Sequence, residues 1–181
     1  PSPSSAPGLR HMFIRARSPS APVGPPALGA SVQEWLHWLE AIHPTEIDLG
    51  LDRVLVVLRR LFPRKPQARI ITVAGTNGKG TTVTALESIL LAAGRSTGAY
   101  MSPHLFRYNE RVRIGGQEIS DAALVTAFER VEAARRGVTL TYFEFGTLAA
   151  FVAFADAGVE NWVLEVGLGG RLGAVNVLEP G

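Results

Sequence analysis

Hydrophobic residues follow two patterns along this chain, a three- to four-residue period in some segments and continuous apolar runs in others. The helical period begins after Ser31, where "SVQE" predicts a capping box between Ser31 and Glu34. The stripe that follows consists of Trp35, Leu36, Trp38, Leu39 and Ile42. The same period predicts further helices over residues 51–61, 81–93, 120–136 and 145–156.

Continuous apolar runs predict strands at "ARIITVAG", "TGAYMS" and "NWVLEV", and the first of these is expected to be buried. The segment "PHLFRYNERVRIGGQEIS" is rich in charge and glycine and predicts a long loop with a short hairpin. Strands that alternate with helices favour an α/β fold, with a mainly parallel sheet and helices on both of its faces.

The first 30 residues differ in composition from the rest. Pro, Ser and Gly supply 15 of them without any regular period, so we expect residues 1–30 to form a disordered arm. Within this arm "GLRHM" resembles an expression scar that precedes Met12. Residues 31–181 are expected to form the folded part.

Charge and composition exclude several functional classes. The net charge of +2 originates in the arm, because residues 31–181 carry 15 basic and 16 acidic groups, which argues against nucleic acid as a partner. The longest apolar runs fall short of the roughly 20 residues that a membrane helix needs, so no membrane role is expected and the cytoplasm is the default location. The chain has no cysteine, which excludes disulfides and thiolate chemistry, and its four histidines are too scattered to predict a metal cluster.

The segment "VAGTNGKGTT" carries the clearest chemical signal. It places backbone N–H groups between a strand and the start of a helix, where the helix dipole favours a polyphosphate. Lys79, one of only two lysines, can place its positive charge against the outer phosphates. The hydroxyls of Thr81 and Thr82 can bind the phosphates or their magnesium. The candidate ATP-binding residues are Gly75, Thr76, Asn77, Gly78, Lys79, Gly80 and Thr81.

This loop departs from the standard nucleotide loop at two positions. The standard pattern has glycine where Val73 stands, and Ser or Thr where Gly80 stands. The alternative is a glycine turn before an ordinary helix. The lysine, the threonines and the upstream strand together favour phosphate binding.

Five motifs, taken in sequence order, can be compared with those of known families: "TEIDLGLDRV", "AGTNGKGTT", "SPHLFRYNERVRI", "LTYFEFGTLAAF" and "LEVGLGGRL". With these motifs, residues 31–181 resemble the folylpolyglutamate synthase and dihydrofolate synthase family of the Mur ligase superfamily. The resemblance implies a P-loop-like ATP-binding domain of the Mur ligase type. It also implies a truncated chain, since family members are much longer and carry a C-terminal domain that supplies further metal, glutamate and adenine contacts.

By this resemblance, the activity is an ATP-dependent ligation of L-glutamate to dihydropteroate or to folates through an acyl phosphate. The implied cofactors are ATP and Mg²⁺, with Lys79 in a catalytic role and Ser102 and Glu165 as magnesium ligands. Hydroxyl and carboxylate oxygens are hard donors, which suits this ion. The implied substrate-binding residues are Glu46, Ile47, Asp48, Leu49, Thr141, Tyr142, Phe143, Glu144, Leu172, Gly173 and Ala174.

Several of these residues have structural alternatives. Glu165 could be an edge charge in an apolar strand, and Ser102 a strand terminator before a proline. The aromatic residues from 142 onward are expected to be mainly core, and Glu144 could simply favour the start of a helix. His104 is expected to be a surface or packing residue.

One substitution bears on the substrate. The family normally has aspartate where Gly173 stands in "GGRLGA", and its loss should weaken recognition of a reduced pterin. Two other functions therefore stay open: a non-catalytic nucleotide-binding module of the same fold, and another Mur-type ligase. The short chain is expected to be inactive by itself, and its oligomeric state is not predicted.

Overall fold

The computed structural model describes residues 24–42, 51–166 and 178. The helices are α1 (Val32–Ile42), α2 (Leu51–Leu61), α3 (Lys79–Ala92), α4 (Asp121–Arg135) and α5 (Tyr142–Ala157), with the 3-10 helix η1 (Tyr108–Arg111). The strands are β1 (Arg69–Ala74), β2 (Thr97–Tyr100), β3 (Val112–Ile114), β4 (Gln117–Glu118) and β5 (Asn161–Val166).

These strands form one mixed sheet in the order β1-β5-β2-β3-β4. Strand β5 lies between β1 and β2 and is parallel to both, whereas β3 and β4 add an antiparallel hairpin. The carboxyl ends of β1, β5 and β2 therefore meet at one edge of the sheet, which is where open α/β sheets bind ligands.

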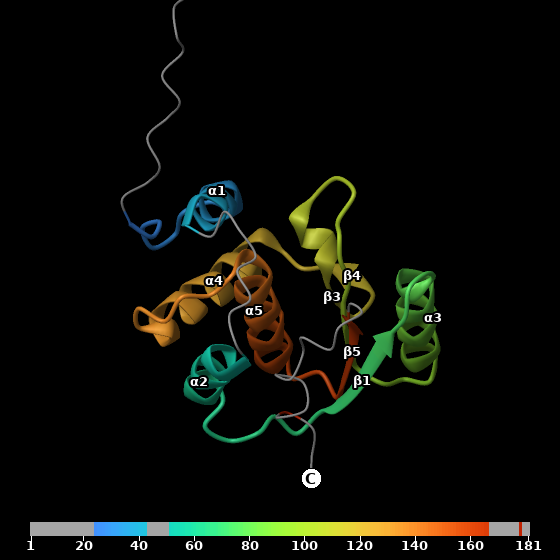
Figure 1. Ribbon diagram of the computed structural model, residues 1–181. Coiled ribbons are helices and arrows are strands. Elements are labelled where there is room, and N and C mark those ends of the chain that lie inside the picture. The colour runs from blue at the N-terminus through green and yellow to red at the C-terminus, as the bar shows by residue number, and fades with distance from the viewer. Residues whose placement is uncertain (1–23, 43–50, 167–177, 179–181) are drawn as a thin grey trace, which may run out of the picture.

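Helices cover both faces of this sheet (Figure 1). Helix α3 packs against β1, β2 and β5 on one face, and α5 packs against β2 and β3 on the other. Helix α4 lies against α5 and is contacted in turn by α1 and α2. The α/β prediction, with helices on both faces, is confirmed.

The side chains of β5 alternate between two cores, as a strand period of two requires. Trp162 and Leu164 face the larger core under α5, while Val163 packs with Val83 and Ala99 under α3. The ring of Phe154 lies so close to β2 that a Cβ on Gly98 would be 2.4 Å from it. Glycine at position 98 therefore lets α5 approach the sheet.

Local signals predicted most elements well. The Ser31 hydroxyl accepts the Glu34 N–H at 3.2 Å, and the Glu34 carboxylate accepts the Ser31 N–H at 2.8 Å, so the predicted capping box is present. The hairpin predicted in the long loop is β3–β4, whereas η1 was not predicted. Helix α3 starts at Lys79, two residues before the predicted start, and α5 starts at Tyr142, three residues before it.

One prediction about burial is wrong. Residues of β1 are half-buried or exposed, although "ARIITVAG" was expected to form a buried strand. Among the strands that the structure describes, β1 lies at one edge of the sheet and has only β5 beside it, which explains the exposure.

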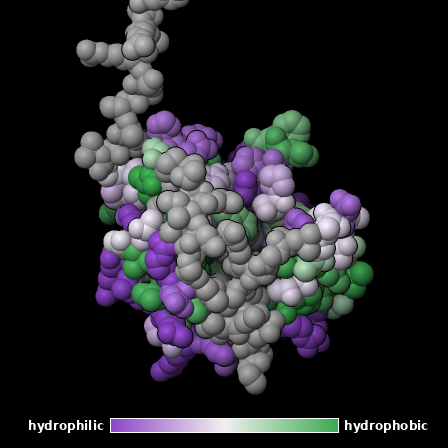
Figure 2. Space-filling view, in the orientation of Figure 1, coloured by the Kyte–Doolittle hydropathy of each residue, from purple (hydrophilic) through white to green (hydrophobic). Residues whose placement is uncertain are grey.

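Most of the predicted arm, residues 1–23, lies outside the described residues. Residues 24–30 are described, and the N–H of Gly29 donates to Glu129 of α4 at 2.9 Å, so this part of the segment is tied to the folded part. Within the described ranges, no helix has both the length and the apolar character needed to cross a membrane. The face shown in Figure 2 mixes hydrophilic residues with smaller hydrophobic areas.

Candidate functional site

The turn between β1 and α3 is the candidate phosphate loop. Gly78 is the N-cap of α3 and has φ of +75°, a left-handed conformation that glycine adopts without a steric penalty. The first backbone bond of the helix runs from the N–H of Thr82 to the carbonyl of Gly78, at 3.0 Å. Within the described part of the chain, the N–H groups of Lys79, Gly80 and Thr81 have no acceptor. These amides form the positive end of the helix and can bind an anion.

The side chain of Lys79 folds over this loop. Its Nζ donates to the carbonyl of Gly75 at 2.8 Å, so the ammonium group lies above the turn rather than pointing away from it. The hydroxyl of Thr82 instead donates to the carbonyl of Gly78 at 3.0 Å, inside the helix. An ammonium group and unpaired amides therefore converge on one turn, whereas the hydroxyl hydrogen of Thr82 is donated within the helix.

The two predicted metal ligands lie together at the carboxyl edge of the sheet. Glu165 is paired in register with Val73, one residue before the end of β1. Its Oε2 accepts the backbone N–H of Ser102, just beyond the end of β2, at 3.3 Å. Both residues are half-buried, and no basic side chain pairs with Glu165 within the described residues.

This donor pair suits magnesium. Mg²⁺ usually takes one or two protein oxygens and completes its shell with water and substrate phosphates. Residues 24–42, 51–166 and 178 contain no cluster of three or more His, Cys, Asp or Glu side chains able to hold a metal by themselves. Ser102 and Glu165 would thus hold the ion together with a bound nucleotide.

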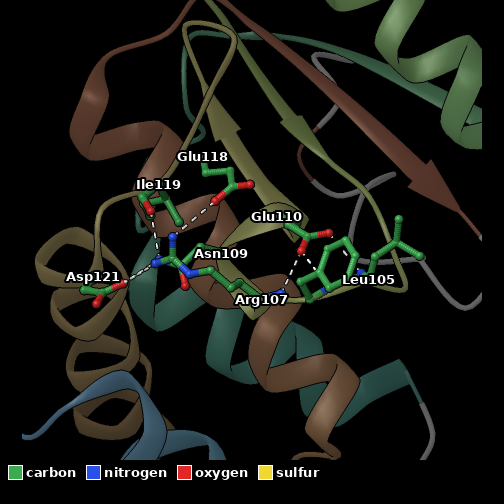
Figure 3. Close-up of polar contacts among 8 residues, drawn as sticks. Leu105, Arg107, Asn109, Glu110, Glu118, Ile119 and Asp121 are labelled. Carbon is green, nitrogen blue, oxygen red and sulfur yellow. Dashed lines mark hydrogen bonds and ion pairs between the residues drawn. The ribbon is translucent and has the colours of Figure 1, made fainter.

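The loop after Ser102 is held by one carboxylate (Figure 3). Glu110 accepts the backbone N–H groups of Leu105, Phe106 and Arg107 at 2.9, 2.7 and 2.7 Å. The N–H of Leu105, followed by those of Arg107 and Phe106, holds the pKa of Glu110 below its ordinary value. The loop keeps its shape although the side chains of Leu105 and Phe106 are 84% and 89% exposed.

The same loop is anchored to the start of α4. Asn109 is buried, and its side-chain amide donates to the carbonyl of Ile119 at 2.9 Å and to Asp121 at 2.8 Å. The guanidinium of Arg107 also donates to Asp121 and pairs with Glu118 (Figure 3). The segment that carries Ser102 is therefore fixed at its far end.

His104 is a packing residue, as predicted. Its Nδ1 accepts the Nε–H of Arg111 at 2.8 Å, and its ring lies 5.7 Å from that of Tyr108. The guanidinium carbon of Arg111 lies 5.1 Å from the centre of the Tyr108 ring and 5.8 Å from that of Tyr142. The sequence analysis did not identify Arg111 as a site residue. The one feature that could have indicated it is its position in the charged loop that follows "SPH".

The candidate substrate residues at the start of α5 also form a helix cap. The Thr141 hydroxyl accepts the Glu144 N–H at 3.1 Å, and the Glu144 carboxylate accepts the Thr141 N–H at 2.8 Å. Tyr142 and Phe143 are half-buried, and Phe143 lies 6.3 Å from Tyr100. Glu144 thus has a structural role here, and its contact with a pterin stays a prediction.

The more distant aromatic residues are core, as expected. Phe145, Phe151 and Phe154 are fully buried. The other predicted substrate residues lie outside the described residues; these are Glu46, Ile47, Asp48, Leu49, Leu172, Gly173 and Ala174.

A hollow of about 540 Å³ lies beside the phosphate loop, on the side of α3 that faces Met101. It is lined by Gly80, Thr81, Thr84, Ala85, Ser88 and Met101. The Thr84 hydroxyl donates to the carbonyl of Gly80 at 2.9 Å, inside the helix. Because Gly80 and Thr81 line the hollow, it adjoins the first turn of α3, where the unpaired amides lie.

Comparison with known proteins places these features in a family context. No model of a known protein family matches the chain. The dihydrofolate synthase/folylpolyglutamate synthase of Escherichia coli K12 is 51% identical over 154 residues, which are 85% of this chain and 36% of that protein. The chain thus spans little more than a third of the length of this relative.

Two solved structures agree with this match. The structure of E. coli FolC in complex with DHPP and ADP is 52% identical with a TM-score of 0.78, over 84% of this chain and 37% of that one. The bifunctional folylpolyglutamate synthase/dihydrofolate synthase of Yersinia pestis, complexed with AMPPNP and Mn ion, is 53% identical with a TM-score of 0.79. That match covers 86% of this chain and 38% of the Yersinia chain.

Proposed function

The chain belongs to the dihydrofolate synthase/folylpolyglutamate synthase family, and on this premise we propose that it forms the ATP- and magnesium-binding part of a glutamate ligase. Residues 31–181 would be the N-terminal, nucleotide-binding portion of that enzyme. Its substrates would be ATP, L-glutamate and either dihydropteroate or a folate. The cytoplasm is the proposed compartment, because a ligase that consumes ATP needs a supply of it.

One observation carries this proposal above all. The first turn of α3 presents three N–H groups without an acceptor in the described residues, and the Lys79 ammonium lies over the same turn. A triphosphate supplies the negative charge that this arrangement lacks. The solved relatives carry ADP or AMPPNP, in keeping with a nucleotide at this loop.

The chemistry requires two anions to meet. A carboxylate is a poor acyl donor, so one of its oxygens attacks the terminal phosphorus of ATP, the bond to the bridging oxygen breaks, and ADP leaves. The amine of glutamate then attacks the carbonyl carbon of the acyl phosphate, phosphate leaves, and the amine loses a proton. Repulsion between the carboxylate and the triphosphate opposes the first step, and the cationic turn at Lys79 reduces it.

Magnesium would be held by Ser102 and Glu165. When bound, the ion neutralises phosphate charge and polarises the transferred phosphoryl group. The contact between the Ser102 N–H and Glu165 keeps the carboxylate at the edge of the sheet where the phosphate loop begins. Ser102 and Glu165 would therefore hold the ion near the phosphate loop.

Nucleotide binding by the chain tests the proposal. We expect saturable, magnesium-dependent ATP binding in isothermal titration calorimetry. Lys79→Ala should weaken it about 10- to 100-fold, since a hydrogen bond to a charged group contributes about 1.5–3 kcal/mol.

Lys65→Ala is the matched control, because it removes the other lysine of the chain and lies outside the phosphate loop. It should bind ATP as the parent does. Equal ATP affinity for the parent and Lys79→Ala would overturn the proposed site, and so would equal losses in both variants.

A further inference from the structure

The guanidinium group of Arg111 is surrounded by a histidine and two tyrosine rings. In the described part of the chain it forms no ion pair, whereas Arg113 pairs with Glu87 and Arg107 pairs with Asp121. Its Nε–H donates to Nδ1 of His104 at 2.8 Å. The two terminal nitrogens carry four of the five N–H donors of arginine, and the Tyr100 phenol is the described side chain that interacts with them.

The surroundings hold the guanidinium in place without cancelling its charge. The rings of Tyr108 and Tyr142 lie 5.1 and 5.8 Å from its central carbon, within the range of a cation–π contact. Burial raises the pKa of Tyr108 well above its ordinary value, and burial also raises the pKa of Tyr142. Both phenols therefore stay neutral, and the positive charge remains available to a ligand.

Arg111 also lies between two parts of the candidate site. Its carbonyl accepts the N–H of Met101 at 2.9 Å, which places it opposite the residue that precedes Ser102. On the other side it contacts Tyr142, the first residue of α5 and a candidate pterin contact. A substrate that extends from the aromatic residues toward Ser102 would pass this guanidinium.

We propose that Arg111 binds the carboxylate of the acyl substrate through its two terminal nitrogens and orients that carboxylate for attack on the terminal phosphate. This inference rests on the proposed function and assigns Arg111 as the residue that binds the reacting carboxylate. An arginine fork matches a carboxylate in a bidentate manner, and each charge-assisted bond is stronger than a neutral one. His104 and the two tyrosines fix the plane of the fork before the substrate arrives.

The test compares ligands with and without the carboxylate. Fluorescence titration would measure the dissociation constants of pteroate and of its methyl ester with the 181-residue chain. The parent should bind pteroate about 10- to 100-fold more tightly than the ester, the range for hydrogen bonds to charged groups. Arg111→Met should lose this preference while its affinity for the ester stays within about twofold of the parent value.

Two further variants separate charge from structure. Arg111→Lys keeps the cation but loses the fork, so its preference for pteroate should be intermediate. Arg107→Met removes a neighbouring loop arginine and should keep the preference of the parent. Should Arg111→Met fail to fold, the ratio measured with Arg111→Lys decides, because an unchanged ratio overturns the inference.

Other outcomes are equally informative. A parent-like preference in Arg111→Met, or an equal loss of both ligands, would overturn the inference. A parent that binds ATP but neither pteroate nor the ester would also overturn it, while leaving the nucleotide site intact. Absence of ATP binding would instead overturn the proposed function. If Arg111→Met weakened ATP but not ADP and kept the preference for pteroate, the arginine would bind the terminal phosphate, contrary to the inference.

Discussion

Gly78 turns the chain into α3 with a left-handed backbone. A Cβ at this position would meet no atom within 4 Å, so a substitution tests backbone strain without steric overlap. We expect Gly78→Ala to lower the free energy of unfolding by about 1–2 kcal/mol, the cost of a left-handed conformation for a residue with a Cβ. Urea denaturation would measure the loss.

Gly80 provides the matched control for Gly78. It lies in the first turn of α3, where a Cβ would also meet nothing within 4 Å, but its φ is not in the left-handed range. Gly80→Ala should therefore leave stability unchanged or raise it by up to about 1 kcal/mol. Equal losses in both variants would show that strain at Gly78 is not the cause.

Glu110 makes the stability of its loop depend on pH. The N–H of Leu105, with those of Arg107 and Phe106, lowers the pKa of Glu110 from its ordinary value of 4.5. A carboxylate with a lowered pKa stabilises the folded state fully above the unfolded pKa and loses that effect as pH falls through the folded one. The difference in unfolding free energy between the parent and Glu110→Gln should thus be constant above about pH 4.5 and shrink at lower pH.

Denaturant titrations of the parent and of Glu110→Gln, at pH values above and below about 4.5, would measure the difference in unfolding free energy. A difference that stays constant into acid would mean that the charge of Glu110 does not hold the loop.

The candidate site residues were predictable to different degrees. Lys79 could be predicted, because its role follows from a contiguous turn of glycines between a strand and a helix. Arg111 could not, because its role depends on which side chains face it. Its contacts with His104 at Nδ1 and with Tyr142 form only after the loop folds back on α5.

An ion pair joins α3 to the β3–β4 hairpin. Glu87 of α3 is 2% exposed and accepts both bonds from the Nε of Arg113, at 3.0 and 3.2 Å. Removing the arginine would leave a buried charge without its partner, a change that costs about 3–5 kcal/mol in fully buried pairs. Arg113 is itself 29% exposed, so we expect Arg113→Met to cost about 3 kcal/mol, at the lower end of that range.

Urea denaturation of a double-mutant cycle would test this link. The Glu87→Gln and Arg113→Met double variant should recover part of the loss, because no uncompensated charge remains. Arg130→Met is the control, since its pair with Asp156 is exposed on both sides and should contribute less than about 1 kcal/mol. An Arg113→Met loss no larger than that of the control would show that the pair does not fix α3.

Elements with local signals were predicted, whereas the order of the strands, which depends on distant contacts, was not. Helix α1 was predicted with its cap, and the Thr141–Glu144 capping box has the same spacing, so the start of α5 could have been predicted from it. The position of β5 between β1 and β2 has no local signal, because strand order depends on contacts between distant segments. The exposure of β1 follows from that order and was therefore missed.

At the scale of the whole molecule, the site is assembled from three strand ends. Lys79, Ser102 and Glu165 follow or end three different strands, and the parallel arrangement of those strands brings their ends to one edge. The glycine-rich turn identified Lys79, and the resemblance to the ligase family identified Ser102 and Glu165. Only the strand order shows that Glu165 meets the N–H of Ser102 beside the phosphate loop.

The chain spans little more than a third of the length of these relatives. A ligation needs the carboxylate, the triphosphate and the amine of glutamate aligned at once, and alignment of this kind contributes about 7–11 kcal/mol to a barrier. The described residues offer candidates for the first two groups and none for the amine. We therefore expect the 181-residue chain to bind magnesium-ATP without detectable glutamylation of dihydropteroate or folate, with radiolabelled glutamate as the readout and the full-length E. coli relative as the positive control. Turnover that Lys79→Ala abolishes would show that the chain holds a complete site, whereas turnover that persists in Lys79→Ala would point to a contaminating ligase.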